Sequence, residues 1–209
     1  MPVVEFVWWS ASDEFLDDYD GLFKPTIDHV SKAEGCLRIF TGLQEQDRTS
    51  FWMVVVWESH ELHQAMMDRP DYPAMVGRLK PFFRDGQIKM NHVEFNNETD
   101  AAFNAPLTSI SFLTLKDGAS LEDLDRLFRV LDNLVDPNHG GYPPGAWGAT
   151  HEDPRKVLYL TGWDSDQAHD SILQVENNSE KYLDPVSDLQ RMADYQRLSI
   201  KLRNHVGRK

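Results

Sequence analysis

The chain has 209 residues, of which 41% are hydrophobic and 26% are charged, and its formal net charge is −13. This composition is typical of a globular protein, and no apolar run approaches the ~20 residues that a membrane-spanning helix needs. Nucleic acids and anionic lipids would repel so acidic a chain. We therefore expect neither nucleic acid nor membrane as a partner.

The first residues, MPVVEFVWW, predict a strand over residues 3–9. The segment is β-branched and aromatic, and it lacks the basic region and the small-residue cleavage site of a signal peptide. Cys36 is the only cysteine, so an intrachain disulfide is excluded, which fits a reducing compartment. We expect a cytoplasmic protein.

After this strand, apolar residues at helical spacing predict a helix over residues 13–27, which Ser12 or Asp13 can cap. Gly21 and Pro25 weaken the middle of this helix. A second helix is expected between the third and fourth strands. The remaining strands of this half are expected at residues 37–43, 51–57 and 87–95.

Residues 96–106 are polar and alanine-rich and end in a proline, which predicts a linker. The same order of elements then returns, with Ser120 as the cap of a helix. The glycine- and proline-rich stretch 136–147 predicts a packed surface loop, with a lid as the alternative. The strands of this half are expected at residues 107–115, 146–150, 157–163 and 195–202.

One constant offset of 106 residues (163 − 57) relates the two halves. It relates Trp57 to Trp163, Ser59 to Ser165, and His63 to His169. The chain is therefore predicted to be α+β, with two ferredoxin-like β-α-β-β-α-β units over residues 1–95 and 107–209. Because helices cover only one face of each sheet, the bare faces are expected to pack together as a pseudo-dimeric α/β barrel.

In both halves a strand ends in Trp-acid-Ser and a histidine follows about one helical turn later, as in WESHELH and WDSDQAH. With the order of elements, this motif resembles the antibiotic biosynthesis monooxygenase-like domains of the dimeric α/β-barrel superfamily. Related domains include cofactor-free oxygenases, polyketide cyclases, haem-handling enzymes and proteins without known activity. The resemblance is therefore more specific for the fold than for the reaction.

Each residue of the repeated motif has a structural and a functional interpretation. Trp57 is expected to fill the end of the core, with a substrate contact as the alternative. Ser59 and Ser165 are expected to cap the helices that follow them. His63 is interpreted either as holding its helix to a strand or as a proton-transfer group.

Glu5 is the most suggestive ionisable residue. It shares a strand face with Val7 and Trp9, and such apolar neighbours are expected to raise its pKa, unless Glu5 faces an edge. The resemblance places Glu5 at the polar first-strand position of the superfamily's cyclases and Tyr72 at a position in their second helix. Both residues depart from the histidines of that pattern. His92, on the strand expected beside the first, would join them.

The catalytic candidates are thus Glu5, His63, Tyr72 and His92, and the candidates for substrate contact are Val7, Trp9, Trp57 and Met90. In the second copy, Ser111 is expected at the position of Glu5, and no histidine lies opposite His92. The pocket of the second copy is therefore expected to be less equipped.

Metal and cofactor sites have little support in the sequence. His60 and His63 are spaced for one helix face, but Asp166 replaces His60 in the second copy and no further ligand is placed. His92 could be considered as the proximal ligand of a haem, but no further feature of the sequence indicates a haem site. Glycine-rich nucleotide turns, phosphate loops and nucleophile elbows are absent from the sequence. We expect no metal and no cofactor.

These features favour a cofactor-independent enzyme that acts on a hydrophobic, polyketide-like or phenolic small molecule by acid–base chemistry, of the cyclase, isomerase or lyase type. A cofactor-free monooxygenase and a non-catalytic small-molecule-binding or stress protein are the alternatives. The chain is also a candidate homodimer.

Overall fold

The computed structural model describes residues 2–176 and 183–206, and it divides the chain into two compact units. The first unit runs to Glu94 and also includes the segment that begins at Arg203, whereas the second comprises Phe95–Leu202. Among the described residues, no helix combines the length and the apolar character that crossing a bilayer requires.

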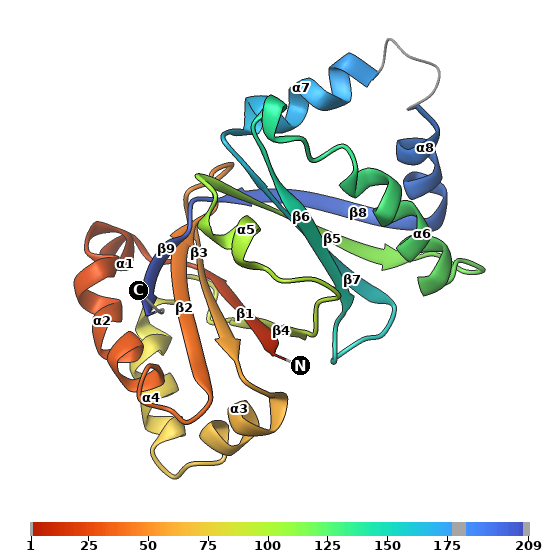
Figure 1. Ribbon diagram of the computed structural model, residues 1–209. Helices are drawn as coiled ribbons and strands as arrows, with labels where there is room; N and C mark the ends of the chain where they lie inside the picture. The colour runs from red at the N-terminus through yellow and green to blue at the C-terminus, as the bar shows by residue number, and fades with distance from the viewer. Residues whose placement is uncertain (1, 177–182, 207–209) are drawn as a thin grey trace. The chain divides into compact units, whose positions relative to one another are not determined.

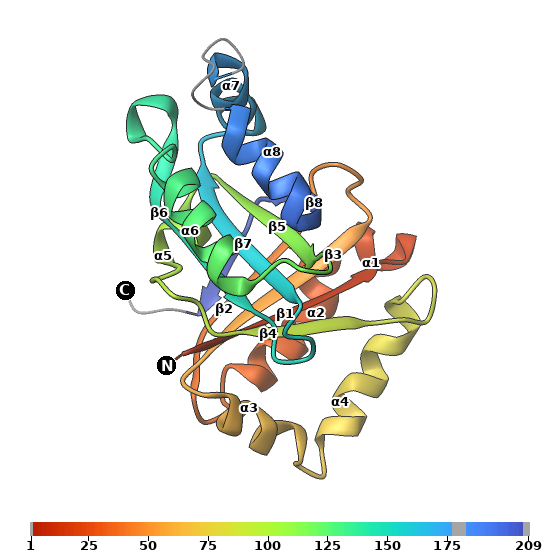
Figure 2. The same ribbon diagram turned by 90° about the vertical axis from the view of Figure 1, so that its right-hand side faces the viewer.

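The first unit is an antiparallel sheet with its helices on one face (Figures 1 and 2). The strand order is β4-β1-β3-β2-β9. The strands are β1 (Val3–Ser10), β2 (Cys36–Leu43), β3 (Ser50–Trp57), β4 (Lys89–Val93) and β9 (Arg203–Val206). The helices are α1 (Asp13–Asp17), α2 (Tyr19–Val30), α3 (His60–Met67), α4 (Tyr72–Leu79) and the short η1 (Lys80–Phe82).

The second unit has a four-stranded antiparallel sheet of order β6-β7-β5-β8, with α6 and α8 side by side (Figure 2). Its strands are β5 (Leu107–Leu115), β6 (Gly141–Ala149), β7 (Lys156–Trp163) and β8 (Ala193–Ile200). Its helices are α5 (Asp100–Asn104), α6 (Leu121–Asp132), η2 (Pro137–His139), α7 (Asp166–Glu176) and α8 (Leu183–Met192).

Both sheets have the same strand order once β9 is set aside, since β2-β3-β1-β4 corresponds to β6-β7-β5-β8. Two tandem ferredoxin-like units, as expected from the repeat, are therefore confirmed. Packing of the two sheets into one barrel stays a prediction.

An aromatic cluster forms the core between the first sheet and its helices. The indole ring of Trp9 lies 4.9 Å from the ring of Phe51 and 5.7 Å from that of Phe23, centroid to centroid. Phe15 packs edge-on against Phe51 at 4.9 Å. Each such side chain buries 150–250 Å² in typical proteins, so this cluster fixes the helices on the sheet face that carries Glu5.

The predicted helix over residues 13–27 is wrong in one respect, because it is divided into α1 and α2. The chain breaks at Asp18, whose backbone (φ −147°, ψ 51°) leaves the helical region and whose carboxylate accepts the amide of Gly21. Ser12 caps α1 by accepting the amide of Phe15. Gly21 and Pro25 are both accommodated within α2.

The structure also differs from the sequence prediction at three boundaries. The linker predicted over 96–106 contains α5, which belongs to the second unit. Most of the loop predicted over 136–147 is η2 and β6. The residues after 202 form β9, which pairs with β2 at the edge of the first sheet and shields that edge.

Ser59 and Ser165 cap their helices as predicted. Ser59 Oγ accepts the amide of Leu62 at 3.4 Å, and Ser165 Oγ accepts the amide of Ala168 at 3.1 Å. The start of α3 also depends on Gly35, which has a φ of +78°. A Cβ on Gly35 would lie 2.6 Å from Cδ1 of Leu62, so only glycine lets α3 approach this closely.

We predict that Gly35→Ala destabilises the protein more than Gly86→Ala. Both glycines have positive φ, but a Cβ on Gly86 (φ +71°) would contact nothing within 4 Å. An alanine at a positive φ therefore costs about 1–2 kcal/mol of backbone strain at either position. Overpacking against Leu62 adds about 1–3 kcal/mol at Gly35 alone. Urea unfolding measures both, and equal losses of stability would contradict the close packing of α3.

Candidate functional site

Glu5 lies on β1, between β3 and β4, where it pairs with Val55 on one side and His92 on the other. The residue is 3% exposed, and its side chain faces the helices together with those of Val7 and Trp9. The alternative that Glu5 faces an edge is wrong. A buried carboxylate is costly unless polar groups surround it.

Trp57 supplies one of those polar groups. Its indole Nε1 donates a hydrogen bond of 2.8 Å to Oε2 of Glu5. Trp57 is the last residue of β3, so the strand end holds the indole beside β1. The imidazole of His63, one turn into α3, stacks on this indole with centroids 4.7 Å apart and planes at 21°.

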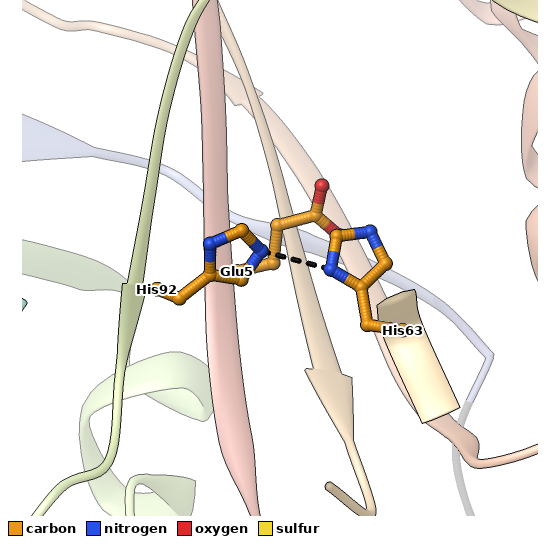
Figure 3. Close-up of side chains that lie close together, drawn as sticks. All are labelled: Glu5, His63 and His92. Atoms are coloured by element: carbon orange, nitrogen blue, oxygen red, sulfur yellow. Dashed lines mark hydrogen bonds and ion pairs between the residues drawn. The ribbon is translucent and has the colours of Figure 1, made fainter. Parts of the chain in front are cut away.

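His63 connects Glu5 with His92 (Figure 3). Its Nδ1 lies 2.8 Å from Nε2 of His92, a hydrogen-bond distance, and its Nε2 lies 3.4 Å from Oε2 of Glu5. The second contact is an electrostatic one, because no described group forms a hydrogen bond with Nε2 of His63. With the His92 Nε2 proton donated to His63, the remaining His63 proton lies on Nε2 and faces Glu5.

His63 is neutral in this environment. Burial, followed by the nearby His92 and His60, lowers the pKa of His63 from 6.5 to about 3. The ring of His60 meets that of His92 edge-on at 5.1 Å. The three histidine rings therefore contact one another in the order His60, His92, His63. Of the three, His63 directs its Nε2–H towards the Glu5 carboxylate.

A cavity of about 30 Å³ begins at Glu5 and runs between the sheet and the helices. Tyr72, at the start of α4, is on its wall. Burial and the charge of Glu5 raise the pKa of Tyr72 to about 12, and the same causes raise that of the Cys36 thiol to about 11. Both groups are therefore protonated near neutral pH.

The structure brings only part of the predicted set onto the cavity wall. Glu5, Tyr72, Val7, Trp9 and Met90 line the cavity. His63, His92 and Trp57 lie behind Glu5 and contact the cavity only through it. Sequence reasoning missed the direct contact between His63 and His92, since 29 residues separate them and only the packing of α3 on β4 joins them.

Glu5, His63 and His92 could also hold a metal ion, because one ligand atom of each lies within 4.8 Å of the others. Two histidines and a carboxylate are a donor set that suits zinc or iron. The 2.8 Å between His63 Nδ1 and His92 Nε2 fits a hydrogen bond better than coordination. Zinc bonds of about 2.1 Å at tetrahedral angles hold two nitrogens roughly 3.4 Å apart.

The second unit has no counterpart of Glu5 and His92 among its described residues, and the strand pairing shows which residues replace them. Pairing aligns Glu5 with Val55, and Val55 corresponds to Thr161, whose partner on β5 is Ser109. The counterpart of Glu5 is therefore Ser109, and the expected equivalence with Ser111 is wrong. His92 corresponds in the same way to Ser199, which is paired with Ser109.

The second unit nevertheless contains the larger cavity, of about 160 Å³. It lies between the sheet and the helices, with Ser111 and His169 on its wall. The second unit thus has no counterpart of the buried carboxylate among its described residues, although its cavity is larger than that of the first unit.

We predict that His63 makes the folded protein sensitive to acid. The folded state keeps His63 neutral down to about pH 3, whereas the unfolded chain protonates it near pH 6.5. Acidification below 6.5 therefore favours unfolding by up to about 1.4 kcal/mol per pH unit. In urea unfolding at pH 7 and pH 5, the stability advantage of wild type over His63→Gln should fall by roughly 2 kcal/mol. The control is His151→Gln, at an exposed position, and an unchanged advantage would contradict the buried neutral imidazole.

We also predict substoichiometric zinc and iron in the purified protein, because the two imidazoles are already hydrogen-bonded to each other. Elemental analysis after dialysis measures this directly. One equivalent of metal that is lost in His92→Asn would show that the group is a metal centre.

Comparison with known proteins shows a shared fold for the whole chain and a similarity to one family for residues 2–78. A proposed monooxygenase from Fusobacterium nucleatum has 12% identity and a TM-score of 0.61, with 99% of this chain and 96% of that chain covered. A proposed monooxygenase from Lactobacillus acidophilus has 11% identity and a TM-score of 0.62, with 98% and 96% covered. An anthrone oxidase-like protein has 14% identity and a TM-score of 0.72, with 97% and 92% covered.

At these identities the three structures show a shared fold. No curated protein matches the sequence significantly. The model of the antibiotic biosynthesis monooxygenase family matches residues 2–78, a range that contains Glu5, Trp57, His63 and Tyr72. Residues 2–78 are thus similar to the antibiotic biosynthesis monooxygenase family, and the whole chain shares the fold of these structures.

Proposed function

We propose that the first unit is a cofactor-independent oxygenase of a hydrophobic small molecule that has an acidic C–H or phenolic O–H group. The observation that carries this proposal is the buried group around Glu5, whose carboxylate lies on the wall of an apolar cavity. Removal of a proton from the substrate by Glu5 is the first step.

Glu5 has the surroundings that a buried base needs. The Trp57 indole donates to one carboxylate oxygen at 2.8 Å, and the His63 Nε2 lies 3.4 Å from the same oxygen. These contacts hold the carboxylate in one orientation at the cavity wall, while the apolar lining excludes water. General bases placed in this way typically contribute about 10²–10⁴ in rate.

Tyr72 is the partner for the substrate oxygen. It shares the cavity wall with Glu5, and its raised pKa of about 12 keeps the phenol protonated. A protonated phenol can donate a hydrogen bond to the oxygen on which negative charge develops as the substrate loses its proton. Glu5 and Tyr72 thus act on the carbon and on the oxygen of an enolate, or both on the oxygen of a phenolate.

Methionine side chains allow the small cavity to accept a larger molecule. The walls include Met53, Met66, Met75 and Met90. Unbranched thioether side chains change rotamer at little cost, so they can repack around a flat apolar substrate. Because the cavity of about 30 Å³ holds little more than a water molecule, binding of a substrate in this proposal requires these side chains to repack.

Oxygenation completes the reaction in the form that the family of residues 2–78 suggests. Loss of a proton leaves an electron-rich carbanion, which dioxygen oxidises. For an acidic methylene the balanced change is R₂CH₂ + O₂ → R₂C=O + H₂O, in which one oxygen atom enters the product. Proton removal by Glu5 would equally begin an isomerisation or cyclisation, and consumption of dioxygen separates these reactions from oxygenation.

We predict that Glu5→Gln lowers kcat/KM by at least about 10²-fold, because the amide cannot accept the proton yet still accepts the Trp57 hydrogen bond. The assay measures dioxygen uptake with anthrone, a neutral tricyclic ketone with an acidic methylene, and with a panel of polycyclic phenols. Glu14→Gln, an exposed change on α1, is the matched control. Tyr72→Phe should lower the rate by about tenfold, through loss of one donor.

Deuterium exchange separates the steps of the reaction. In anaerobic D₂O, wild type should exchange the acidic proton of its substrate without forming product, and Glu5→Gln should not. Product formed without dioxygen would indicate an isomerase or cyclase. Full exchange and turnover in Glu5→Gln would contradict the role of Glu5, and neither exchange nor turnover across the panel would favour a binding protein.

A further inference from the structure

The cavity of the second unit has the size of a single aromatic ring. Its volume is about 160 Å³, and an engineered cavity of about 150 Å³ in another protein takes up benzene. Apolar side chains from the helices and the sheet form most of the wall, among them Leu131, Leu189 and Trp163.

Several polar groups on this wall have no partner among the described residues, among them the buried hydroxyl of Tyr159, and two of them are suited to a phenol. The first is the hydroxyl of Ser111 on β5. The second is Nε2 of His169 on α7, because Nδ1 of that ring lies 3.0 Å from a carboxylate oxygen of Asp170. A neutral imidazole that donates from Nδ1 to the carboxylate has Nε2 as an acceptor. The cavity therefore offers an acceptor and a hydroxyl to a ligand.

The charge around His169 favours a neutral ligand. Arg197 is on the cavity wall, but its guanidinium lies 3.1 Å from Asp166 and 3.2 Å from Asp170. Burial is the largest cause, and Arg197 the second, of the lowered pKa of His169, so the imidazole is uncharged near neutral pH. The two carboxylates offset the single cation, which leaves no positive charge for an anion.

We propose that the second unit binds a small neutral phenol, whose ring fills the cavity and whose hydroxyl donates to Nε2 of His169 beside the hydroxyl of Ser111. The repeat supports a role distinct from that of the first unit. His169 corresponds to His63, but His63 bonds His92, whereas His169 has Nε2 left for a ligand. The proposal does not depend on catalysis by Glu5.

The test measures binding of phenol, toluene and benzoate to the full chain by calorimetric titration. Phenol should bind most tightly, because toluene lacks the donor and benzoate brings a charge near two carboxylates. His169→Phe keeps an aromatic ring but removes the acceptor, so it should weaken phenol about tenfold and leave toluene unchanged. Benzoate binding more tightly than phenol, or no effect of His169→Phe on phenol, would overturn the proposal.

A matched pair of substitutions locates the binding. Ser111→Leu fills the cavity of the second unit and should abolish binding of phenol and toluene. Thr114→Leu, an exposed change on the same strand, is the control and should leave the affinity for phenol unchanged. Loss of phenol binding in Thr114→Leu, or its retention in folded Ser111→Leu, would place the ligand outside this cavity and overturn the proposal. If Ser111→Leu does not fold, phenol-induced shifts of the Tyr159 and Tyr195 amides in wild type decide the location, and their absence would overturn it.

Discussion

A carboxylate buried on the helix-covered face of an apolar sheet is the constraint on which the first unit depends. Glu5 is 3% exposed, and burial of an unpaired carboxylate would cost several kcal/mol. The cost is offset by groups from three elements, namely Trp57 at the end of β3, His63 on α3 and His92 on β4. The capped start of α3 and the close approach of Gly35 to Leu62 hold His63 over Trp57. A core that needed only stability could place an aliphatic residue at Glu5, so the retained polar group points to chemistry.

The two units solve the same packing problem with different side chains. The first unit, with methionines and Glu5 on the wall, has a cavity of about 30 Å³, and the second, with Ser111 of β5 on the wall, has one of about 160 Å³. The change follows from the pairing register, because Val7 and Glu5 of β1 correspond to Ser111 and Ser109 of β5. In the second unit serines stand at the positions of Glu5 and His92, so no buried carboxylate or second imidazole is present there to contact His169. Nε2 of His169 is therefore available to a ligand in the cavity.

The segments that follow the last strand of each repeat form hydrogen bonds with β6 and β2. The backbone amide of Asn96, which follows the last strand of the first repeat, donates to the carbonyl of Trp147 on β6 in the second unit. The segment after β8 forms β9, which pairs with β2 in the first unit. β2 and β6 thus each gain hydrogen-bond partners from residues that follow the other repeat's last strand, which limits pairing of these two strands with foreign chains.

The sequence by itself determined the repeat, the element order, the ferredoxin-like unit and the caps at Ser59 and Ser165. These depend on local periodicity and on short-range hydrogen bonds, which single residues at fixed spacing specify. It also placed Glu5 on the apolar face of β1, because side chains alternate along a strand. The break at Asp18, the helix α5 and the strand β9 were missed, because each depends on long-range packing or on a single backbone angle.

Only the tertiary structure decided which polar residues meet. The contact between His63 and His92 requires α3 to pack over β4, and no local pattern encodes it. The sequence offset aligned Glu5 with Ser111, whereas the strand ladder aligns it with Ser109, since register is fixed by pairing and not by counting along the chain. The cavities were likewise beyond the sequence, because the volume left between a sheet and its helices is set by how side chains from several elements fill the same space.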